Sequence, residues 1–278
     1  METRERMEVL VIGAGAMGGW FARLFKSWGW KVWVTDIDCR KSATLAKELD
    51  VEVGDEILPQ ADFVLVAVPI SSTPTVVREV GGRMKKGALL MEVSSVKEQV
   101  ISVMKELKSC QIELVALHPL FGPGATGVKG ERFAFIPVKT GKLFKEVRRK
   151  LEKEGATLIK VDAEKHDLIM ARVQALTHLL LLLYLQTCEK GELQTHLSAS
   201  LLELAKAMLA GNPSIYYEIQ NLNRFAPRIR REFLQTWQQL EAIIEAGEKE
   251  EFEKMFKKLK KRFEEGEIEQ AYKRLYAS

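Results

Sequence analysis

The sequence predicts an α/β domain built on a doubly wound, mostly parallel sheet, followed by an all-α helical domain. Two observations predict it. Up to about Asp162, short β-branched runs alternate with amphipathic stretches that are long enough to be crossover helices. From Ala163 onward the β-branched runs disappear and helix-forming residues take over. We therefore predict two domains, residues 1–162 and residues 163–278.

The expected strands are apolar along their whole length, which is typical of a parallel sheet covered on both faces. They are Glu8–Ile12, Lys31–Thr35, Phe63–Val68, Ala88–Val93, Glu113–Leu117, Phe133–Val138 and Thr157–Val161. The helices expected between them are Met17–Trp28, Arg40–Leu49, Thr73–Met84, Lys97–Leu107 and Lys142–Glu154. In the second domain, breaks at Gly191, Gly211-Asn212-Pro213, Pro227 and Gly247 predict four or five helices.

Composition excludes several classes of protein. With 46% hydrophobic and 29% charged residues, the 278-residue chain suits folded domains with full cores. Its 42 basic and 38 acidic residues are interspersed, so we expect a small anionic ligand and no nucleic-acid partner. The start of the chain lacks a signal-peptide pattern, and the apolar run Leu179–Leu185 is shorter than the ~20 residues that span a bilayer. We therefore expect a soluble protein without a membrane partner.

The cysteines indicate the compartment. Cys39, Cys110 and Cys188 are odd in number, far apart, and in no spacing that holds a metal. The pattern argues against a disulfide framework and against a zinc site. We therefore expect a reducing cytoplasm and no metal.

One helix of the second domain predicts self-association. The stretch Leu176–Leu185 is apolar nearly all the way round, as in helices that are buried on every side. A dimer interface hides such a helix more easily than a small monomeric bundle does. We expect a homodimer through the helical domain, with a monomeric bundle core as the alternative.

A glycine fingerprint follows the first strand. Gly13, Gly15 and Gly18 stand in a Gly-x-Gly-x-x-Gly pattern between a strand and a helix. The first glycine permits a tight turn, the second lets backbone approach a pyrophosphate, and the third lets the helix pack closely. The helix N-terminus then offers N–H groups to phosphates. This predicts a Rossmann-type dinucleotide-binding domain, the alternative being a glycine-rich turn without a ligand.

The second strand indicates which dinucleotide binds. Asp36 ends that strand, eighteen residues after Gly18. A carboxylate there accepts hydrogen bonds from the ribose hydroxyls and repels a 2′-phosphate, which favours NAD over NADP. Arg40 and Lys41 keep NADP open, because they are able to hold that phosphate. The expected cofactor-binding residues are Gly13, Gly15, Ala16, Met17, Gly18, Asp36, Val68, Pro69 and Ser94.

Polar clusters follow two further strands, at the sheet edge where doubly wound sheets bind ligands. In the run His118–Pro123, His118 is the expected base that removes a hydroxyl proton during hydride loss. In the run Ser94–Lys97, Ser95 is expected to orient His118 or the substrate hydroxyl, and Lys97 to bind an anion or to be solvated. The alternatives are a serine that caps a helix and a histidine packed in the core.

The remaining histidines are less informative. His166, beside Asp167, is more typical of a capping or packing residue than of a catalyst. His178 begins an apolar helix, where a polar group must find a partner, so a ligand-facing role and a structural role stay equally open. We assign no role to His196.

Several segments together resemble a known family. In chain order they are Gly13–Gly18, Ser95-Val96-Lys97, His118-Pro119-Leu120-Phe121-Gly122-Pro123, His166-Asp167, Gln174-Ala175-Leu176-Thr177-His178 and Asn212-Pro213-Ser214-Ile215-Tyr216. The sequence resembles the prephenate dehydrogenases, the NAD-linked enzymes of tyrosine biosynthesis. The His-Pro-x-Phe-Gly-Pro run is the most specific of these features.

The resemblance implies oxidative decarboxylation of prephenate to 4-hydroxyphenylpyruvate, in a cleft between the Rossmann domain and a dimerising helical domain. By this resemblance His118 takes the proton of the ring hydroxyl as hydride leaves C4 for nicotinamide. Ser95 shares that hydrogen-bond network, and His178 contacts the substrate from the helical domain. Members of the family also occur fused to chorismate mutase, so fusion to or association with that enzyme stays open.

The sequence departs from the family at one place. The family commonly carries an arginine on the helix before the Asn-Pro turn, where it holds a substrate carboxylate. Here the only basic residue of the expected helix Leu201–Leu209 is Lys206. Lys206, Arg172 or Arg224 is expected to take that role, or else the substrate is held differently.

Three other functions stay open at this point. An arogenate dehydrogenase performs the same chemistry on a substrate with an amine in place of the keto group. A β-hydroxyacid dehydrogenase uses a lysine of the helical domain as its base and leaves the His118 run unexplained. A catalytically inactive NAD-binding dimeric sensor keeps the fold and binds NAD without turnover.

Overall fold

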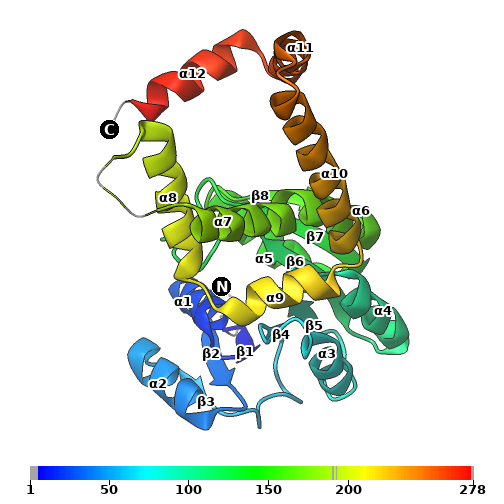
Figure 1. Cartoon of the computed structure of the whole chain (residues 1–278). Coiled ribbons are helices and arrows are strands. Elements are labelled where there is room, and N and C mark those ends of the chain that lie inside the picture. The colour runs from blue at the N-terminus through cyan, green and yellow to red at the C-terminus, as the bar shows by residue number, and fades with distance from the viewer. Residues whose placement is uncertain (1–5, 190, 192, 277–278) are drawn as a thin grey trace. The chain divides into compact units, whose positions relative to one another are not determined.

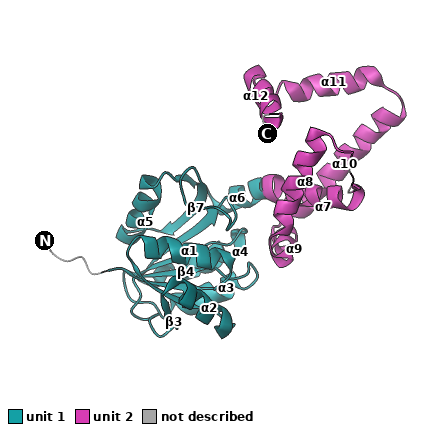
Figure 2. Cartoon of the chain, turned by 90° about the vertical axis from the view of Figure 1, so that its left-hand side faces the viewer, with its two compact units in different colours: residues 1–170 teal, residues 171–278 magenta. Residues whose placement is uncertain are grey.

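The computed structural model describes residues 6–189, 191 and 193–276. The chain forms two compact units, residues 1–170 and residues 171–278 (Figure 2). The predicted boundary after Asp162 coincides with the start of helix α6, Ala163–Met170, and α6 itself belongs to the first unit.

The first unit is built on an eight-stranded sheet in the order β3-β2-β1-β4-β5-β6-β7-β8. All neighbouring strands are parallel except β6 and β7, which are antiparallel. The strands are β1 Glu8–Ile12, β2 Lys31–Thr35, β3 Glu52–Val53, β4 Phe63–Val66, β5 Leu89–Glu92, β6 Glu113–Pro119, β7 Arg132–Lys139 and β8 Thr157–Lys160 (Figure 1). Because β1 lies between β2 and β4, the strand order reverses beside β1, which is where such sheets bind nucleotides.

Helices cover both faces of this sheet and close two apolar cores. One core packs Phe21 and Phe25 of α1 and Phe144 of α5 against the sheet, and the other packs Val77 of α3 and Met104 of α4. The helices are α1 Ala16–Ser27, α2 Cys39–Leu49, α3 Thr73–Gly81, α4 Glu98–Glu106, the 3₁₀ turn η1 Leu107–Ser109, and α5 Lys142–Lys153. The predicted doubly wound α/β domain is confirmed.

The ends of several strands differ from the prediction by one or two residues, and the sheet differs most at β3 and at the end of β6. Strand β3 was not predicted because it has only two residues, both exposed, and therefore no apolar periodicity. Strand β6 continues beyond the predicted end at Leu117, because His118 and Pro119 pair with Ala134 and Phe133 of β7. His118 consequently lies inside a strand and not in a loop.

The second unit is helical throughout its regular structure. A π-helical turn, η2 Ala171–Ala175, leads from α6 into α7. The helices are α7 Leu176–Thr187, α8 His196–Leu209, α9 Pro213–Leu222, α10 Ala226–Glu245, α11 Lys249–Lys260 and α12 Glu265–Leu275.

The prediction of four or five helices was wrong, because the described chain has seven from Ala163 onward. The predicted break at Pro227 is confirmed, since α9 ends at Leu222 and Pro227 lies in the first turn of α10, where proline is tolerated. The break between α11 and α12 carries neither glycine nor proline. Instead, Glu264 and Glu267 form a capping box there, a signal that the sequence analysis did not use.

The Leu-rich helix is less buried than predicted. Of its apolar side chains Leu181 is buried, but Leu180 and Leu183 are 42% and 43% exposed. The alternative of a monomeric bundle core does not account for these exposed leucines, because the small core around Leu181, Ala205 and Met208 covers only one side of α7. The exposed leucines are available to a second copy of the chain.

The apolar stretch is also longer than the sequence analysis recognised. The continuous helical run from Ala163 to Thr187 has 25 residues, enough by length and composition to cross a bilayer, and 22% of its most apolar window is buried. A single helix of this kind is weak evidence of a membrane span. A helix of a soluble protein with an interface to cover satisfies the same two criteria.

Candidate active site

Gly13 and Gly18 of the fingerprint have the steric roles that the sequence assigned to them. Gly13 has φ +106°, and a Cβ there would overlap the carbonyl oxygen of Ala67. A Cβ on Gly18 would overlap the carbonyl oxygen of Gly13, so that glycine allows α1 to pack on the turn. A Cβ on Gly15 would meet no atom within 4 Å, which leaves open space where a pyrophosphate would approach.

The residues around this turn fit a dinucleotide. Gly15 caps α1 without a side chain of its own, so the first N–H groups of the helix face the open side. The Asp36 carboxylate accepts hydrogen bonds from Ala14 N at 2.7 Å and from Asp38 N at 2.9 Å. Since a carboxylate has about four acceptor sites, Asp36 keeps capacity for ribose hydroxyls while the turn holds it in place.

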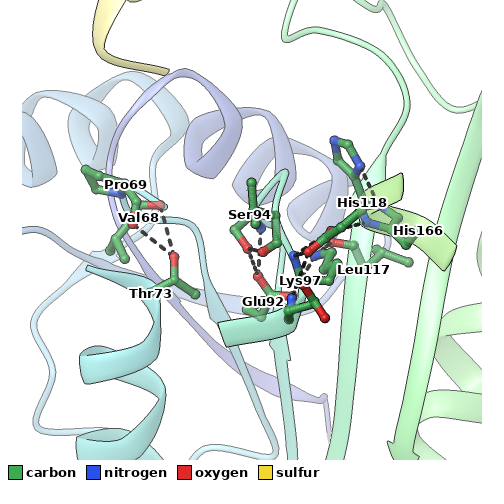
Figure 3. A network of polar contacts seen from close by, with 12 residues as sticks. Val68, Pro69, Thr73, Glu92, Ser94, Lys97, Leu117, His118 and His166 are labelled. Atoms are coloured by element: carbon green, nitrogen blue, oxygen red, sulfur yellow. Dashed lines mark hydrogen bonds and ion pairs between the residues drawn. The ribbon is translucent and has the colours of Figure 1, made fainter. Parts of the chain in front are cut away.

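The other residues predicted to bind the cofactor lie at the same edge of the sheet. Val68 and Pro69 follow β4, and their carbonyl oxygens accept hydrogen bonds from Thr73 Oγ1, at 3.4 and 3.0 Å (Figure 3). Ala16 and Met17 are the first two residues of α1. All of these residues therefore lie around the end of β1, as the fingerprint predicts.

His118 lies at the end of β6 and is only 3% exposed. Its Nδ1 is 2.9 Å from Nε2 of His166, and the two rings meet edge to face (Figure 3). Ser95 was predicted to orient His118 or the substrate hydroxyl, whereas the hydrogen bond of the His118 ring described here is to His166. Ser95 itself is half-buried, and its role stays a prediction.

His166 is part of a buried polar chain and not a simple packing residue. Its Nδ1 is 2.7 Å from Oδ1 of Asp167. The Asp167 carboxylate also accepts hydrogen bonds from the backbone N–H groups of Lys97, at 2.9 and 3.1 Å, and of Glu98, at 3.0 Å. Asp167 thus ties α6 to the start of α4. The sequence analysis missed this role because 48 residues separate His118 from His166.

Lys97 is fully buried, so the expectation that it is solvated was wrong, and the anion that it holds in this structure is the Glu92 carboxylate. Its Nζ forms a 2.6 Å ion pair with Glu92 and donates to the carbonyl oxygen of Leu117 at 2.9 Å (Figure 3). The buried ammonium group of Lys97 has lost its hydration, so a partner of opposite charge must offset the cost of burying its charge. Glu92, which ends β5, supplies that partner.

Ser94 is bound into the same cluster. Glu92 Oε2 accepts hydrogen bonds from the backbone N–H of Ser94 at 2.7 Å and from its hydroxyl at 2.6 Å. The hydroxyl also lies 2.9 Å from the carbonyl oxygen of Val96. The side chain of Ser94 is therefore committed within the protein, and its predicted contact with the cofactor stays a prediction.

Burial controls the protonation of this cluster. Desolvation is the largest cause that lowers the pKa of His118 well below the ordinary value for histidine, and His166 and Lys97 lower it further. Burial lowers the pKa of His166 as well, although the hydrogen bond with Asp167 opposes that shift. His118 is therefore neutral near pH 7 and able to accept a proton.

His178 lies in the first turn of α7 in the second unit. Its ring meets Tyr216 edge to face, with ring centroids 4.7 Å apart. Within the part of the chain that the structure describes, the buried Nδ1 of His178 and the buried Oε1 of Gln174 have no hydrogen-bond partner. Burial lowers the pKa of His178. Gln174 was not predicted as a site residue, although its spacing of four from His178 was a usable signal.

The three cations proposed for the substrate carboxylate differ in their surroundings. Lys206 is exposed and forms a 2.6 Å ion pair with Glu203, one turn earlier in α8. Arg172 is exposed and lies 3.2 Å from Glu232 of α10. The Arg224 guanidinium stacks over the Phe225 ring at 4.7 Å. Exposed ion pairs are weak, so Lys206 and Arg172 can exchange their partners for a substrate carboxylate.

These features define a class of protein, a dinucleotide-dependent oxidoreductase with a helical second unit. Two family models match the chain, "Prephenate dehydrogenase, nucleotide-binding domain" over residues 21–160 and "Prephenate dehydrogenase, dimerization domain" over residues 162–258. The chain belongs to the prephenate dehydrogenase family. The resemblance noted in the sequence is thereby confirmed.

Individual relatives agree with this assignment. A probable arogenate/prephenate dehydrogenase of Methanocaldococcus jannaschii is 31% identical over 91% of this chain, and the chain spans 60% of that relative. A 4-amino-4-deoxyprephenate dehydrogenase of Streptomyces pristinaespiralis is 29% identical, over 91% of this chain and 89% of the relative. The names of these relatives give different substrates. They therefore establish the family but not the substrate of this protein.

A solved structure has the same fold. Prephenate dehydrogenase of A. aeolicus, in complex with hydroxyphenyl propionate and NAD+, superposes with a TM-score of 0.76 at 21% identity, covering 94% of this chain and 98% of that one. The predicted cofactor, NAD, agrees with the nucleotide-binding family model and with that complex.

Proposed function

We propose that this protein catalyses the NAD-dependent oxidative decarboxylation of prephenate to 4-hydroxyphenylpyruvate. The observation that carries the proposal is the buried, neutral His118 at the sheet edge that also bears the dinucleotide fingerprint. A hydroxyl group placed against this neutral imidazole can give it a proton while C4 of the same substrate gives up hydride.

The chemistry balances with one proton acceptor. NAD, when bound, supplies the acceptor for the hydride from C4. His118 accepts the proton of the C4 hydroxyl as that hydride leaves. The bond from the ring to its carboxylate then breaks, its electron pair makes the ring aromatic, and carbon dioxide departs. His118 returns the proton to the phenolic oxygen, so the reaction releases no net proton.

The second unit completes the proposal. His178 and Gln174 contact the pyruvyl side chain, which is supported by their unsatisfied buried atoms within the described chain. Lys206, Arg172 or Arg224 holds the side-chain carboxylate, which persists through the reaction. The exposed leucines of α7 and the matching dimerization-domain model support a homodimer through this unit. Unpaired Cys39, Cys110 and Cys188 fit a reducing cytoplasm.

Two related substrates are the alternatives within the family. Arogenate carries an amine on the side chain, and 4-amino-4-deoxyprephenate, the substrate named for the Streptomyces relative, carries one on the ring. The Gln174 amide has both a carbonyl oxygen and an NH₂ group, so it can pair with a keto oxygen or with an ammonium group. Gln174 alone does not discriminate between the side chains of prephenate and arogenate.

A spectrophotometric assay tests the proposal. Each of the three substrates is supplied with NAD and, separately, with NADP, and the reduced cofactor is followed by absorbance. We expect the highest kcat/KM with prephenate and NAD. A higher value with another substrate would reassign the substrate, whereas NAD binding without turnover of any substrate would identify a sensor.

A further inference from the structure

We infer that His166 and Asp167 are positioning residues that fix the tautomer of His118, so that its Nε2 faces the substrate as a lone pair. The inference rests on the proposed role of His118 as the proton acceptor. The three side chains form one continuous hydrogen-bonded chain, with contacts of 2.9 and 2.7 Å. All three are buried, with exposures of 3%, 1% and 0%.

Proton accounting along the chain assigns the tautomer. An ionised carboxylate only accepts hydrogen bonds, so His166 Nδ1 must carry the hydrogen that faces Asp167. In neutral His166 the other nitrogen, Nε2, is then a lone pair. His118 Nδ1, 2.9 Å away, must therefore donate its hydrogen to that lone pair. Neutral His118 has no second hydrogen, which leaves Nε2 as the basic atom.

The opposite tautomer is disfavoured by the same contacts. If His118 carried its hydrogen on Nε2, His166 would have to donate from its own Nε2. Its Nδ1 lone pair would then face the Asp167 carboxylate at 2.7 Å, with two acceptors in contact. Asp167 is held as an acceptor because two backbone N–H groups, of Lys97 and Glu98, also donate to it. Two buried acceptors in contact without a donor are costly, so the hydrogen bonds favour the tautomer of His118 that is protonated at Nδ1.

Lys97 connects this chain to the backbone of the base. Its N–H donates to Asp167, and its Nζ donates to the carbonyl oxygen of Leu117, the residue before His118. Lys97 thus restrains both ends of the hydrogen-bonded row of side chains, Asp167 at one end and the backbone beside His118 at the other. The charged and titratable groups around His118 are His166 and Asp167 from α6, Lys97 at the start of α4, and Glu92 from β5. The Lys97 charge opposes a second proton on His118.

The tautomer can be measured directly. In protein labelled with ¹⁵N-histidine, nitrogen shifts separate a protonated from an unprotonated ring nitrogen, and the sequence has only four histidines to assign. We expect the wild type to show His118 protonated at Nδ1 and unprotonated at Nε2. A wild-type spectrum with His118 protonated at Nε2, or with both tautomers mixed, would overturn the inference without any variant.

Substitutions at His166 test the effect on catalysis. His166→Phe removes both hydrogen bonds and should mix the His118 tautomers, lower kcat roughly 10- to 100-fold, and change KM little. His166→Gln should restore part of the loss, because its amide can donate to Asp167 and accept from His118. Asp162→Ala is the matched structural control. It removes a cap on Lys165 N of the same helix and should leave both the tautomer and kcat unchanged.

The possible failures are distinguishable. If the wild type turns over none of the substrates but shows the expected tautomer, the proposed function fails and the positioning role survives. If turnover is normal and His166→Phe matches Asp162→Ala in kcat and in the His118 spectrum, the positioning role is wrong and the proposed function stands.

Discussion

The two units differ in how their buried histidines are partnered, although within the described residues the first unit also buries one unpartnered ring N–H, Nε1 of Trp33. In the first unit His118, His166, Asp167, Lys97 and Glu92 form one buried hydrogen-bonded cluster. In the second unit, within the described residues, the buried atoms Nδ1 of His178 and Oε1 of Gln174 have no partner, and several large leucines are exposed. We infer that the cluster around His118 is preorganised for proton transfer, whereas His178 and Gln174 keep buried atoms available to a ligand.

This contrast predicts different kinetic effects. A change in the preorganised cluster should lower kcat, because it disturbs the group that acts in the transition state. A change in the second unit should raise KM, because it removes binding that is the same in ground state and transition state. Each prediction below tests one side of the contrast, beginning with the largest expected effect.

The largest effect is expected for His118→Asn. Asparagine keeps a polar side chain but cannot accept the proton, so kcat should fall by ~10²–10⁴. NAD binding, measured by fluorescence titration, should be unchanged, and KM for prephenate should change little. A kcat near that of the wild type would rule out His118 as the base.

The pH profile of the wild type tests the same group. Burial lowers the pKa of His118 in the folded protein, so the base stays neutral to lower pH than an ordinary histidine does. Activity should therefore persist as pH falls through the usual titration range of histidine, and kcat/KM should decline only below it. An acid limb centred near pH ~6.5, the ordinary value, would show that this imidazole is not desolvated during turnover.

Asp36→Ala should change cofactor choice without changing the catalytic step. The substitution removes acceptors for the ribose hydroxyls and the charge that repels a 2′-phosphate. We expect the ratio of kcat/KM for NAD to that for NADP to fall roughly tenfold or more, the effect of one hydrogen bond to a charged group. If the wild type already prefers NADP, or if the ratio stays constant, Asp36 does not select the cofactor.

Lys206→Ala tests the second unit. Loss of a cation that holds the side-chain carboxylate should raise KM for prephenate roughly tenfold with little change in kcat, because this binding is the same in the ground state and the transition state. Lysine is a point charge without a bidentate fork, so it holds the carboxylate more weakly than arginine would. Arg172→Ala and Arg224→Ala are the matched comparisons. If one of them raises KM while Lys206→Ala does not, that arginine is the anchor. If none does, the substrate is not prephenate or is held by other groups.

The sequence predicted regular elements well where the local pattern determines them. Strands β1 and β2 begin and end where expected, because continuous apolar runs are bounded by polar residues and glycine. Fingerprint geometry was also predictable, since each glycine answers a local steric requirement. The edge strand β3 and the break between α11 and α12 carry weaker local signals and were missed.

The candidate site was only half predictable, for a related reason. His118 stands out because a family motif surrounds it. Its partnership with His166, and the burial of Lys97 against Glu92, depend on α6 and α4 meeting at the sheet edge, which no local pattern encodes. Lysine at a helix start is usually solvated, so the complete burial of Lys97 was the least expected feature of the site.

The smallest effect is expected for Ser95→Ala, which separates a positioning role for Ser95 from that of His166. Ser95 is half-buried, one residue beyond the Ser94 that binds Glu92. The hydrogen bond to His166 already orients the His118 ring. Ser95 would therefore contribute only by positioning the substrate hydroxyl. A single neutral hydrogen bond contributes about 1 kcal/mol, so we expect kcat to fall roughly fivefold, with the His118 tautomer unchanged in ¹⁵N spectra. A loss as large as that of His166→Phe, together with mixed tautomers, would mean that Ser95 and not the buried chain orients the base.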